Sequence, residues 1–178
     1  PLDKTAMDAA RLRQAQLAKP PGSLGRLEEL SIQLAGITGK VRNQIKKKHL
    51  LVFAADNGVV SEGVSSAPQS VTLQQAINLT RAKTGASTLC KHFGCDITVC
   101  DVGVNADIKD TKVLNRKIAY GTQNIIQGPA MTREQAMQAI AIGIELAMET
   151  EADVIGIGEM GIGNTTTSAV VLSVLLDT

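Results

Sequence analysis

The chain has 178 residues, enough for one main domain with a sizeable core but too few for two large domains. Its 18 basic and 17 acidic residues give a formal charge of +1, so nothing indicates attraction to nucleic acid or to an anionic membrane surface. Aromatic residues make up only 2% of the chain, which disfavours a base-stacking platform, and no apolar stretch is long enough to span a bilayer.

Two helices are predicted before any strand. Residues 6–18 are rich in strong helix formers, and Pro20 ends this segment because proline lacks the backbone donor. A second helix is predicted to begin near Ser23, with apolar residues at helical spacing, and Gly36 and Gly39 mark its end. We therefore expect residues 1–45 to form a small helical subdomain.

Strands then alternate with helices through residues 46–178. The apolar run 50–55 predicts a parallel strand buried on both faces. Helices are predicted at about 72–82 and 86–93, and the next strand covers 97–100.

A capping box begins the next long helix. Thr132 and Gln135 have the required three-residue spacing, so the helix is predicted to start at Arg133. A strand over 153–158 and a helix over 165–176 follow. This alternation indicates an α/β doubly wound fold, with a mostly parallel sheet and helices on both faces.

Three predicted strands end in an acid that is followed within two residues by glycine: Asp56, Asp101 and Glu159. Parallel strands with right-handed crossovers bring their carboxyl ends to one edge of the sheet, where α/β folds bind ligands. A single acid at a strand end can simply cap a turn. The three together favour a binding site.

A glycine-rich segment, residues 156–166, is predicted to join the last strand to the last helix. Four glycines there would let backbone N–H groups approach a ligand, and the hydroxyls of Thr165 and Thr166 at a helix N-terminus favour a phosphate monoester. On this interpretation, valine at Gly161 would block the ligand while the fold survives. The segment also contains G-x-G-x-x-G, so dinucleotide binding stays open as an alternative.

Cysteine and histidine chemistry is not indicated. The spacing of Cys90, Cys95 and Cys100 fits neither a zinc knuckle nor a redox pair, so we expect free thiols in a reducing cytoplasm and no metal. His49 and His92 are isolated from any triad partner. Covalent catalysis is therefore not expected.

Four motifs, in this order and spacing, resemble the nicotinate-nucleotide:dimethylbenzimidazole phosphoribosyltransferases. They are PPGSLGRLE at Pro20–Glu28, ADNGV at Ala55–Val59 with EGV at Glu62–Val64, GPAMT at Gly128–Thr132, and GEMGIGNTT at Gly158–Thr166. The similarity covers nearly the whole chain but only the N-terminal half of such an enzyme. It implies a Rossmann-like domain that is incomplete at its C-terminus.

The resemblance implies transfer of the 5-phosphoribosyl group of nicotinate mononucleotide to 5,6-dimethylbenzimidazole or a related base. The product is α-ribazole phosphate, for the lower loop of cobalamin. No cofactor is implied, and a cytoplasmic homodimer is expected. The family's general base is a glutamate of the C-terminal half, so no catalytic residue is expected in this chain, and the missing half is an expected partner. A dinucleotide-binding oxidoreductase and a non-catalytic nucleotide-binding subunit stay open as alternatives.

The same resemblance assigns two sets of site residues and one further candidate. The phosphoribosyl group would meet Glu159, Gly161, Gly163, Asn164, Thr165 and Thr166. The acceptor base would meet Asp56, Asn57, Ala67, Pro68 and Gln75. Asp101 would lie in the same crevice, and Ala67 stands where some relatives have serine, so one polar contact to the acceptor would be missing.

Overall fold

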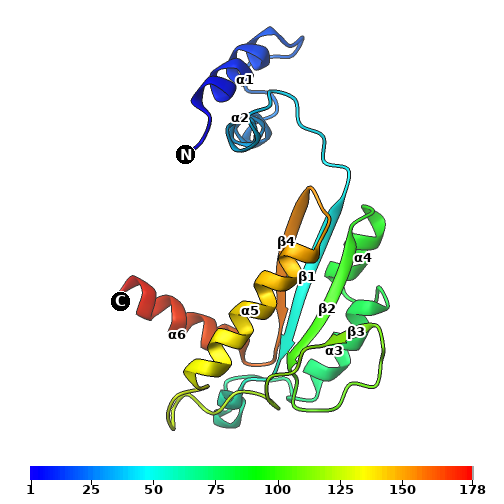
Figure 1. Ribbon diagram of the computed structural model, residues 1–178, viewed down its shortest axis with the longest axis vertical. Coiled ribbons are helices and arrows are strands. Elements are labelled where there is room, and N and C mark those ends of the chain that lie inside the picture. Colours follow the sequence, from blue (N-terminus) through cyan, green and yellow to red (C-terminus); the bar gives the residue numbers. More distant parts are fainter. Residues whose placement is uncertain (178) are drawn as a thin grey trace. The chain divides into compact units, whose positions relative to one another are not determined.

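The computed structural model describes residues 1–177, and they divide into two compact units with the boundary between Ile45 and Lys46. Both units are drawn in Figure 1. None of the described helices has the length and apolar character needed to cross a membrane.

The first unit is a pair of packed helices, α1 (Lys4–Gln16) and α2 (Arg26–Thr38). The helix α1 starts two residues earlier than the sequence predicted, because Asp3 caps it by accepting the Ala6 N–H at 3.0 Å. Small side chains let the two helices approach closely, and the buried residues are the alanines Ala6, Ala10 and Ala35.

Lys19, in the turn between α1 and α2, forms an ion pair of 2.6 Å with Glu28 in the first turn of α2, and both side chains are largely shielded from solvent. The Glu28 carboxylate also accepts the Leu24 N–H, and together these contacts hold its pKa below the ordinary value, the Lys19 hydrogen bond being the largest cause. Gly22 and Gly25 have φ of +73° and +52°, which favour glycine. The Pro-Pro-Gly-Ser-Leu-Gly stretch is thus an ordered connection.

The second unit is built on a four-stranded parallel sheet in the order β3-β2-β1-β4. The strands are β1 (Lys48–Ala55), β2 (Asp96–Gly103), β3 (Val113–Asn115) and β4 (Val154–Met160). The sequence predicted β1, β2 and β4. It missed β3, which has only three residues and therefore no detectable alternation.

Helices cover both faces of this sheet, as the alternation of elements predicted. On one face lie α3 (Val71–Thr80) and α4 (Gly85–His92); on the other lies α5 (Arg133–Glu149). The capping box is present: Thr132 Oγ1 accepts the Gln135 N–H, and Gln135 Oε1 accepts the Thr132 N–H. The last helix, α6 (Asn164–Leu176), has no buried residue in the described chain, and a 3₁₀ turn, η1 (Gly58–Glu62), follows β1.

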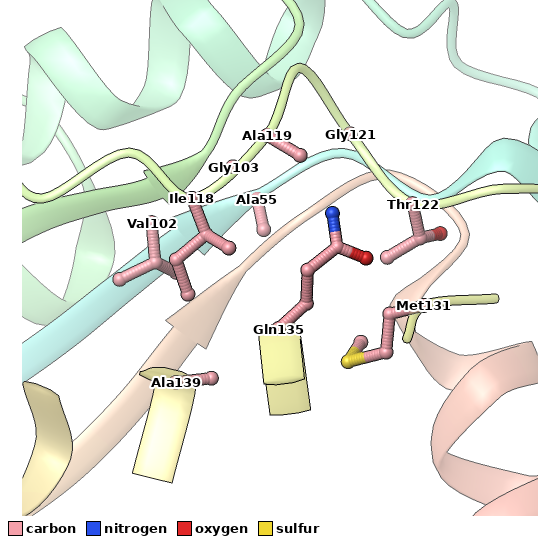
Figure 2. A pocket seen from close by; sticks show the side chains of 10 residues that line it. All are labelled: Ala55, Val102, Gly103, Ile118, Ala119, Gly121, Thr122, Met131, Gln135 and Ala139. Carbon is pink, nitrogen blue, oxygen red and sulfur yellow. The ribbon is translucent and has the colours of Figure 1, made fainter. Parts of the chain in front are cut away.

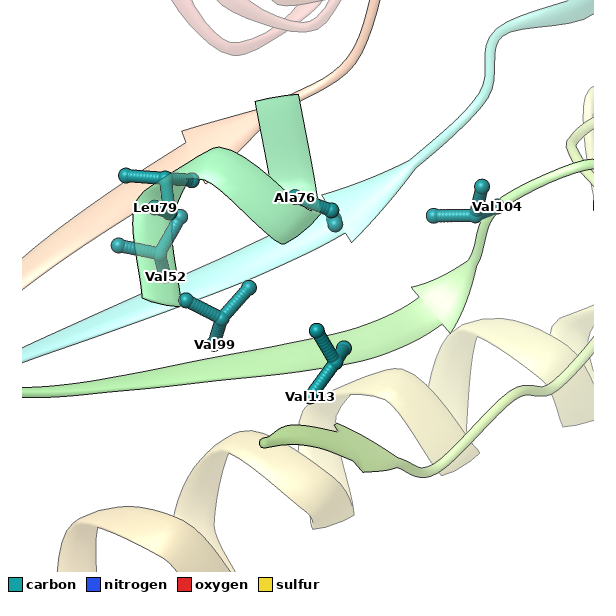
Figure 3. Packing of buried hydrophobic residues seen from close by; sticks show 7 residues of the cluster. Val52, Ala76, Leu79, Val99, Val104 and Val113 are labelled. Atoms are coloured by element: carbon teal, nitrogen blue, oxygen red, sulfur yellow. The ribbon is translucent and has the colours of Figure 1, made fainter. Parts of the chain in front are cut away.

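Aliphatic side chains form the core on each face. Towards α3, the buried cluster contains Val52, Ala54, Ala76, Leu79, Val99, Val104 and Val113 (Figure 3). Towards α5, the strand residues Leu51 and Cys100 pack against Leu146. Successive residues of β1 thus enter opposite cores, which explains why the sequence of this strand is a continuous apolar run.

Candidate functional site

The connectivity creates a crevice between the ends of β1 and β4. From β1 the chain moves outwards on one side, to β2 and then β3, and α5 returns it to β4 on the other side of β1. After β1 the chain continues to α3 on one face, whereas α6, after β4, lines a pocket together with Ala130 and Met131, just before α5. Ligands of open α/β folds bind at such a point.

Asn57 joins the two segments that border this crevice. Its side-chain amide donates to the Ile162 carbonyl at 3.1 Å and accepts from the Thr167 hydroxyl at 3.1 Å. The Ile162 N–H donates in turn to Thr72 Oγ1 at 3.0 Å, and Thr72 is fully buried at the start of α3. The crevice is therefore held by polar contacts from β1, α3 and the turn before α6. Sequence reasoning missed Thr72, because nothing in its local pattern signals a partner ninety residues away.

The glycines of the segment 156–166 have a different placement from the one predicted. Because β4 extends to Met160, Gly156 and Gly158 are strand residues, and only Gly161 and Gly163 belong to the turn. The G-x-G-x-x-G pattern is therefore mostly within a strand, whereas a dinucleotide fingerprint opens a helix. This geometry disfavours the dinucleotide alternative.

Packing explains the two turn glycines without any ligand. A Cβ on Gly161 would lie 2.1 Å from the Ala55 carbonyl oxygen, so the turn approaches the end of β1 too closely for a side chain. Gly163 has φ of +85°, and a Cβ there would lie 2.8 Å from Val60 Cγ2. The expectation that valine at Gly161 would spare the fold is therefore wrong.

The N-terminus of α6 carries the predicted phosphate-binding residues. Asn164 begins the helix, and its amide donates to the Glu159 carboxylate across the turn. Thr165 is exposed and Thr166 is partly exposed, while no side chain caps the helix. The helix dipole and the two hydroxyl groups favour an anion at this helix start, whereas the adjacent Glu159 carboxylate opposes one.

A cavity of about 400 Å³ lies beside this turn, on the α3 face of the sheet. It brings Gln75 of α3 together with the Glu159 end of β4, two residues that the resemblance assigned to different substrates. The full lining is Leu50, Val52, Gln75, Leu79, Thr84, Ala86, Ile157, Gly158, Glu159 and Met160. Mostly apolar walls with few polar groups are typical of pockets for small organic ligands. Ala67 and Pro68 lie in the loop before α3 and do not line this cavity.

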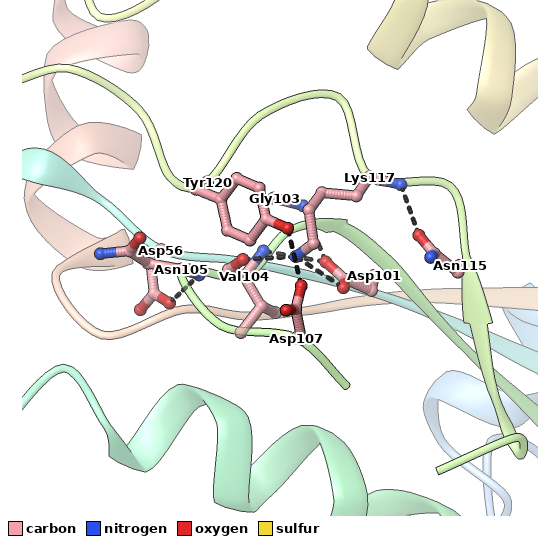
Figure 4. A network of polar contacts seen from close by, with 9 residues as sticks. All are labelled: Asp56, Asp101, Gly103, Val104, Asn105, Asp107, Asn115, Lys117 and Tyr120. Carbon is pink, nitrogen blue, oxygen red and sulfur yellow. Dashed lines mark hydrogen bonds and ion pairs between the residues drawn. The ribbon is translucent and has the colours of Figure 1, made fainter. Parts of the chain in front are cut away.

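Asp56, at the end of β1, is buried rather than open to a ligand. Only 2% of the residue is exposed, and its Oδ2 accepts the Asn105 N–H at 2.7 Å (Figure 4). Its Oδ1 is one of two buried side-chain atoms in the described chain without a hydrogen-bond partner. Asp56 therefore binds the backbone of the loop after β2 instead of facing a ligand.

Asp101 also has a structural role instead of the predicted crevice position. It is 2% exposed and pairs with Lys117, whose Nζ lies 2.8 Å from Oδ2 (Figure 4). Its Oδ1 accepts the N–H groups of Gly103 and Val104 at 3.1 and 2.9 Å. The ends of β1 and β4 define the crevice, and β2 lies on the other side of β1. The three acids therefore do not converge on one site.

Tyr120 completes this network. Its hydroxyl donates to Asp107 at 2.6 Å, and the ring lies 4.9 Å from Lys117 Nζ. The hydrogen bond to Asp107 raises the pKa of the Tyr120 hydroxyl. The segment between β2 and α5 is thus fastened to the sheet by charged contacts that the sequence did not indicate.

A second, smaller cavity of about 90 Å³ lies on the α5 face at the ends of β1 and β2 (Figure 2). Ala55, Val102, Ile118 and Ala139 supply apolar walls, and the Gln135 amide points into it. This volume would hold only a few water molecules, so it is too small for a nucleotide.

The buried thiol of Cys100 in β2 is not suited to act as a nucleophile. Burial raises the pKa of the Cys100 thiol to about 11, so it remains protonated at neutral pH and is a poor nucleophile. Within residues 1–177, no three or more His, Cys, Asp or Glu side chains are grouped closely enough to hold a metal ion.

Comparison with known proteins gives consistent results. A profile of a phosphoribosyltransferase family matches residues 1–178. The nicotinate-nucleotide–dimethylbenzimidazole phosphoribosyltransferase of Clostridium tetani is 48% identical over 98% of this chain and 49% of its own length. That of Ruminiclostridium cellulolyticum is 51% identical over 98% of this chain and 51% of its own length.

A solved structure shares the fold. The crystal structure of the Thermus thermophilus nicotinate-nucleotide–dimethylbenzimidazole phosphoribosyltransferase superposes with a TM-score of 0.92 at 41% identity. The match covers 99% of this chain and 55% of that protein. The chain thus spans about half the length of the relatives it matches.

Proposed function

Because the chain belongs to the phosphoribosyltransferase family that includes the nicotinate-nucleotide–dimethylbenzimidazole enzymes, we propose that the protein moves a 5-phosphoribosyl group from nicotinate mononucleotide to 5,6-dimethylbenzimidazole or a related base. The product is α-ribazole phosphate, for the lower loop of cobalamin. The observation that carries the proposal is the crevice between β1 and β4, where an anion-attracting helix start adjoins an apolar cavity.

The donor's phosphate would bind at the start of α6. The positive end of the helix dipole attracts phosphate, and the hydroxyls of Thr165 and Thr166 are donors. The backbone N–H groups of Asn164 and Thr166 already donate within the turn, to the Gly161 and Gly163 carbonyls at 3.0 and 3.2 Å. Gly161 and Gly163 shape this turn by letting it pack against the end of β1. Their contribution to donor binding is therefore indirect, through the position of the helix start.

The acceptor would lie in the cavity on the α3 face. Its apolar walls suit a fused aromatic ring, and the Gln75 amide can hydrogen-bond a ring nitrogen. The position of Asn57 supports a role as a clamp that joins the two walls. Ala67 does not line this cavity, so its missing hydroxyl has no bearing on how an acceptor would fit there.

The reaction needs mainly positioning and one base. A nitrogen of the acceptor attacks the anomeric carbon of the ribose, the bond from that carbon to the pyridinium nitrogen breaks, and nicotinate leaves with the bonding electron pair. The configuration at this carbon inverts. Since the leaving nitrogen already carries positive charge, no acid is required, but the acceptor's N–H proton must pass to a general base.

We propose that this base is a glutamate outside these residues. Relatives are about twice as long, and α6 exposes a run of large apolar side chains that further polypeptide would cover: Val170, Val171, Leu172, Val174 and Leu175. We also propose a cytoplasmic homodimer, which light scattering of the full-length protein would test.

The direct experiment is a turnover assay with the full-length protein. Nicotinate mononucleotide and 5,6-dimethylbenzimidazole are mixed with the enzyme, and nicotinate and α-ribazole phosphate are separated and quantified. Equal amounts of both products are expected. Nicotinate formed without the riboside would indicate a hydrolase, and the absence of both products would reject the proposal.

A further inference from the structure

The four glycines between residues 156 and 163 differ in what requires them. Gly161 and Gly163 are fixed by the protein itself, through a close backbone approach and a positive φ respectively. Gly156 and Gly158 have φ values open to any residue and lie in the middle of β4. Glycine weakens a strand interior, so its presence at these two positions needs another reason.

Packing within the protein does not supply that reason. A Cβ on Gly158 would find its nearest neighbour, Val52 Cγ2, at 3.4 Å, which is an ordinary van der Waals contact. A Cβ on Gly156 would lie 3.1 Å from Leu50 Cδ1, the end of a flexible side chain. Alanine would therefore fit the fold at Gly158 and would need only a small shift of Leu50 at Gly156.

The two glycines share one face of β4. The register pairs Leu50 with Gly156 and Val52 with Gly158, and paired residues of parallel strands point to the same side. Val52 belongs to the α3-side core, so this is the face on which the 400 Å³ cavity lies. Of the two, Gly158 lines the cavity, and its missing side chain leaves that part of the cavity wall as bare backbone.

We propose that Gly158 is a specificity-determining residue, and that the flat face of a two-ring aromatic acceptor lies on the bare backbone of β4. Gly156 lies on the same face of β4 but does not line the cavity. The reacting nitrogen points towards the Glu159 end, where β4 meets the crevice, and the distal ring reaches towards Leu79. This inference rests on the proposed function, because it assigns the cavity to the acceptor.

The test is Gly158→Ala in the full-length protein, assayed with 5,6-dimethylbenzimidazole, benzimidazole and imidazole. The added methyl group narrows the cavity, so the KM for 5,6-dimethylbenzimidazole should rise at least about tenfold, that for benzimidazole less, and that for imidazole less than about twofold. The KM for nicotinate mononucleotide should not change. The same factor for all three acceptors, or no change for any, would overturn the inference.

Gly143→Ala is the matched control, since Gly143 lies on α5 and a Cβ there meets nothing within 4 Å. Its three acceptor KM values should equal those of the wild type. If Gly158→Ala does not fold, as judged by circular dichroism, the same comparison is made with Ala86→Val. Ala86 is exposed and lines the same cavity, so its larger replacement should also penalise the two-ring acceptors most.

Equilibrium binding separates this inference from the proposed function. The intrinsic fluorescence of 5,6-dimethylbenzimidazole reports its binding to the wild type and to Gly158→Ala without any donor. If the wild type shows no transfer but binds the base, and Gly158→Ala weakens that binding, the acceptor pocket is supported and the proposed reaction is rejected. If the wild type catalyses transfer and both proteins bind the base equally well, the role of Gly158 is rejected and the proposed reaction is supported.

Discussion

Gln75 is the polar group best placed to orient an acceptor, because it projects from α3 into the cavity beside β4. We expect Gln75→Ala to raise the acceptor KM about threefold to tenfold, which corresponds to the about 0.5–1.5 kcal/mol of one hydrogen bond. The KM for nicotinate mononucleotide should stay constant, as steady-state kinetics on the full-length protein would show.

Gln74→Ala is a suitable control for that substitution. Gln74 precedes Gln75 on the same helix, is exposed and does not line the cavity. It should leave both KM values unchanged. An equal loss for donor and acceptor in Gln75→Ala would contradict a role in orienting the base.

Gly161 is required by the packing of the turn against β1, whether or not a ligand binds. Because a Cβ there would lie 2.1 Å from the Ala55 carbonyl oxygen, Gly161→Val must displace the turn or the end of β1. We expect a loss of at least about 2 kcal/mol in the free energy of unfolding, measured by urea denaturation.

Gly143→Ala is the control for this stability measurement. A Cβ at Gly143 meets nothing within 4 Å, and the residue lies in a helix, where alanine is favoured over glycine by up to about 1 kcal/mol. This substitution should leave the protein as stable as the wild type or more stable. A Gly161→Val protein with unchanged unfolding and lost donor affinity would restore the interpretation in which this glycine makes room for a ligand.

At the scale of elements, the start of α5 was predicted in detail, because both halves of its capping box are local. Thr132→Ala removes the acceptor for the Gln135 N–H, so the free energy of unfolding should fall by about 1 kcal/mol. Thermal or urea unfolding measures the change. Thr111→Ala, at an exposed turn position, should have no effect, and equal losses for the two variants would argue that the cap contributes nothing.

The element that local signals missed is the segment between β2 and α5. The Asp101–Lys117 pair, which is largely buried, connects it to the sheet across sixteen residues, and a contact of that kind has no sequence period. The prediction of an open carboxylate at Asp101 came from its place at a strand end. The lysine that neutralises it could not be identified without the fold.

For the whole molecule, we expect residues 1–178 alone not to catalyse transfer. A positioned general base contributes about a hundredfold to ten-thousandfold, and the exposed apolar side chains of α6 should also lower solubility. The measurement is turnover by purified residues 1–178, compared with the same chain mixed with the remaining polypeptide of the full-length protein. Activity should appear only in the mixture.

Circular dichroism of residues 1–178 is the necessary control, since an unfolded chain would be inactive for a trivial reason. Turnover by the folded chain alone at the rate of the mixture would contradict the proposal. The base would then have to lie within these residues, and Glu159 would be the first candidate, because it is exposed at the crevice whereas Asp56 and Asp101 are buried.

The sequence by itself determined the alternation of strands and helices, the capping box at Thr132 and the family resemblance, because each depends on residues close together in the chain. Periodicity and caps act over a few positions, and family motifs keep their spacing. The glycine-rich segment was found in the same way, but the reason for each of its glycines was not.

Only the tertiary structure decided which glycines the packing requires and which leave space, and which acids are exposed. Gly161 meets the Ala55 backbone, Gly158 faces a cavity, and Asp101 meets Lys117. All three outcomes depend on the strand order, which places β4 beside β1 although about a hundred residues separate them. Such contacts form when the sheet assembles, so no local pattern in the sequence records them.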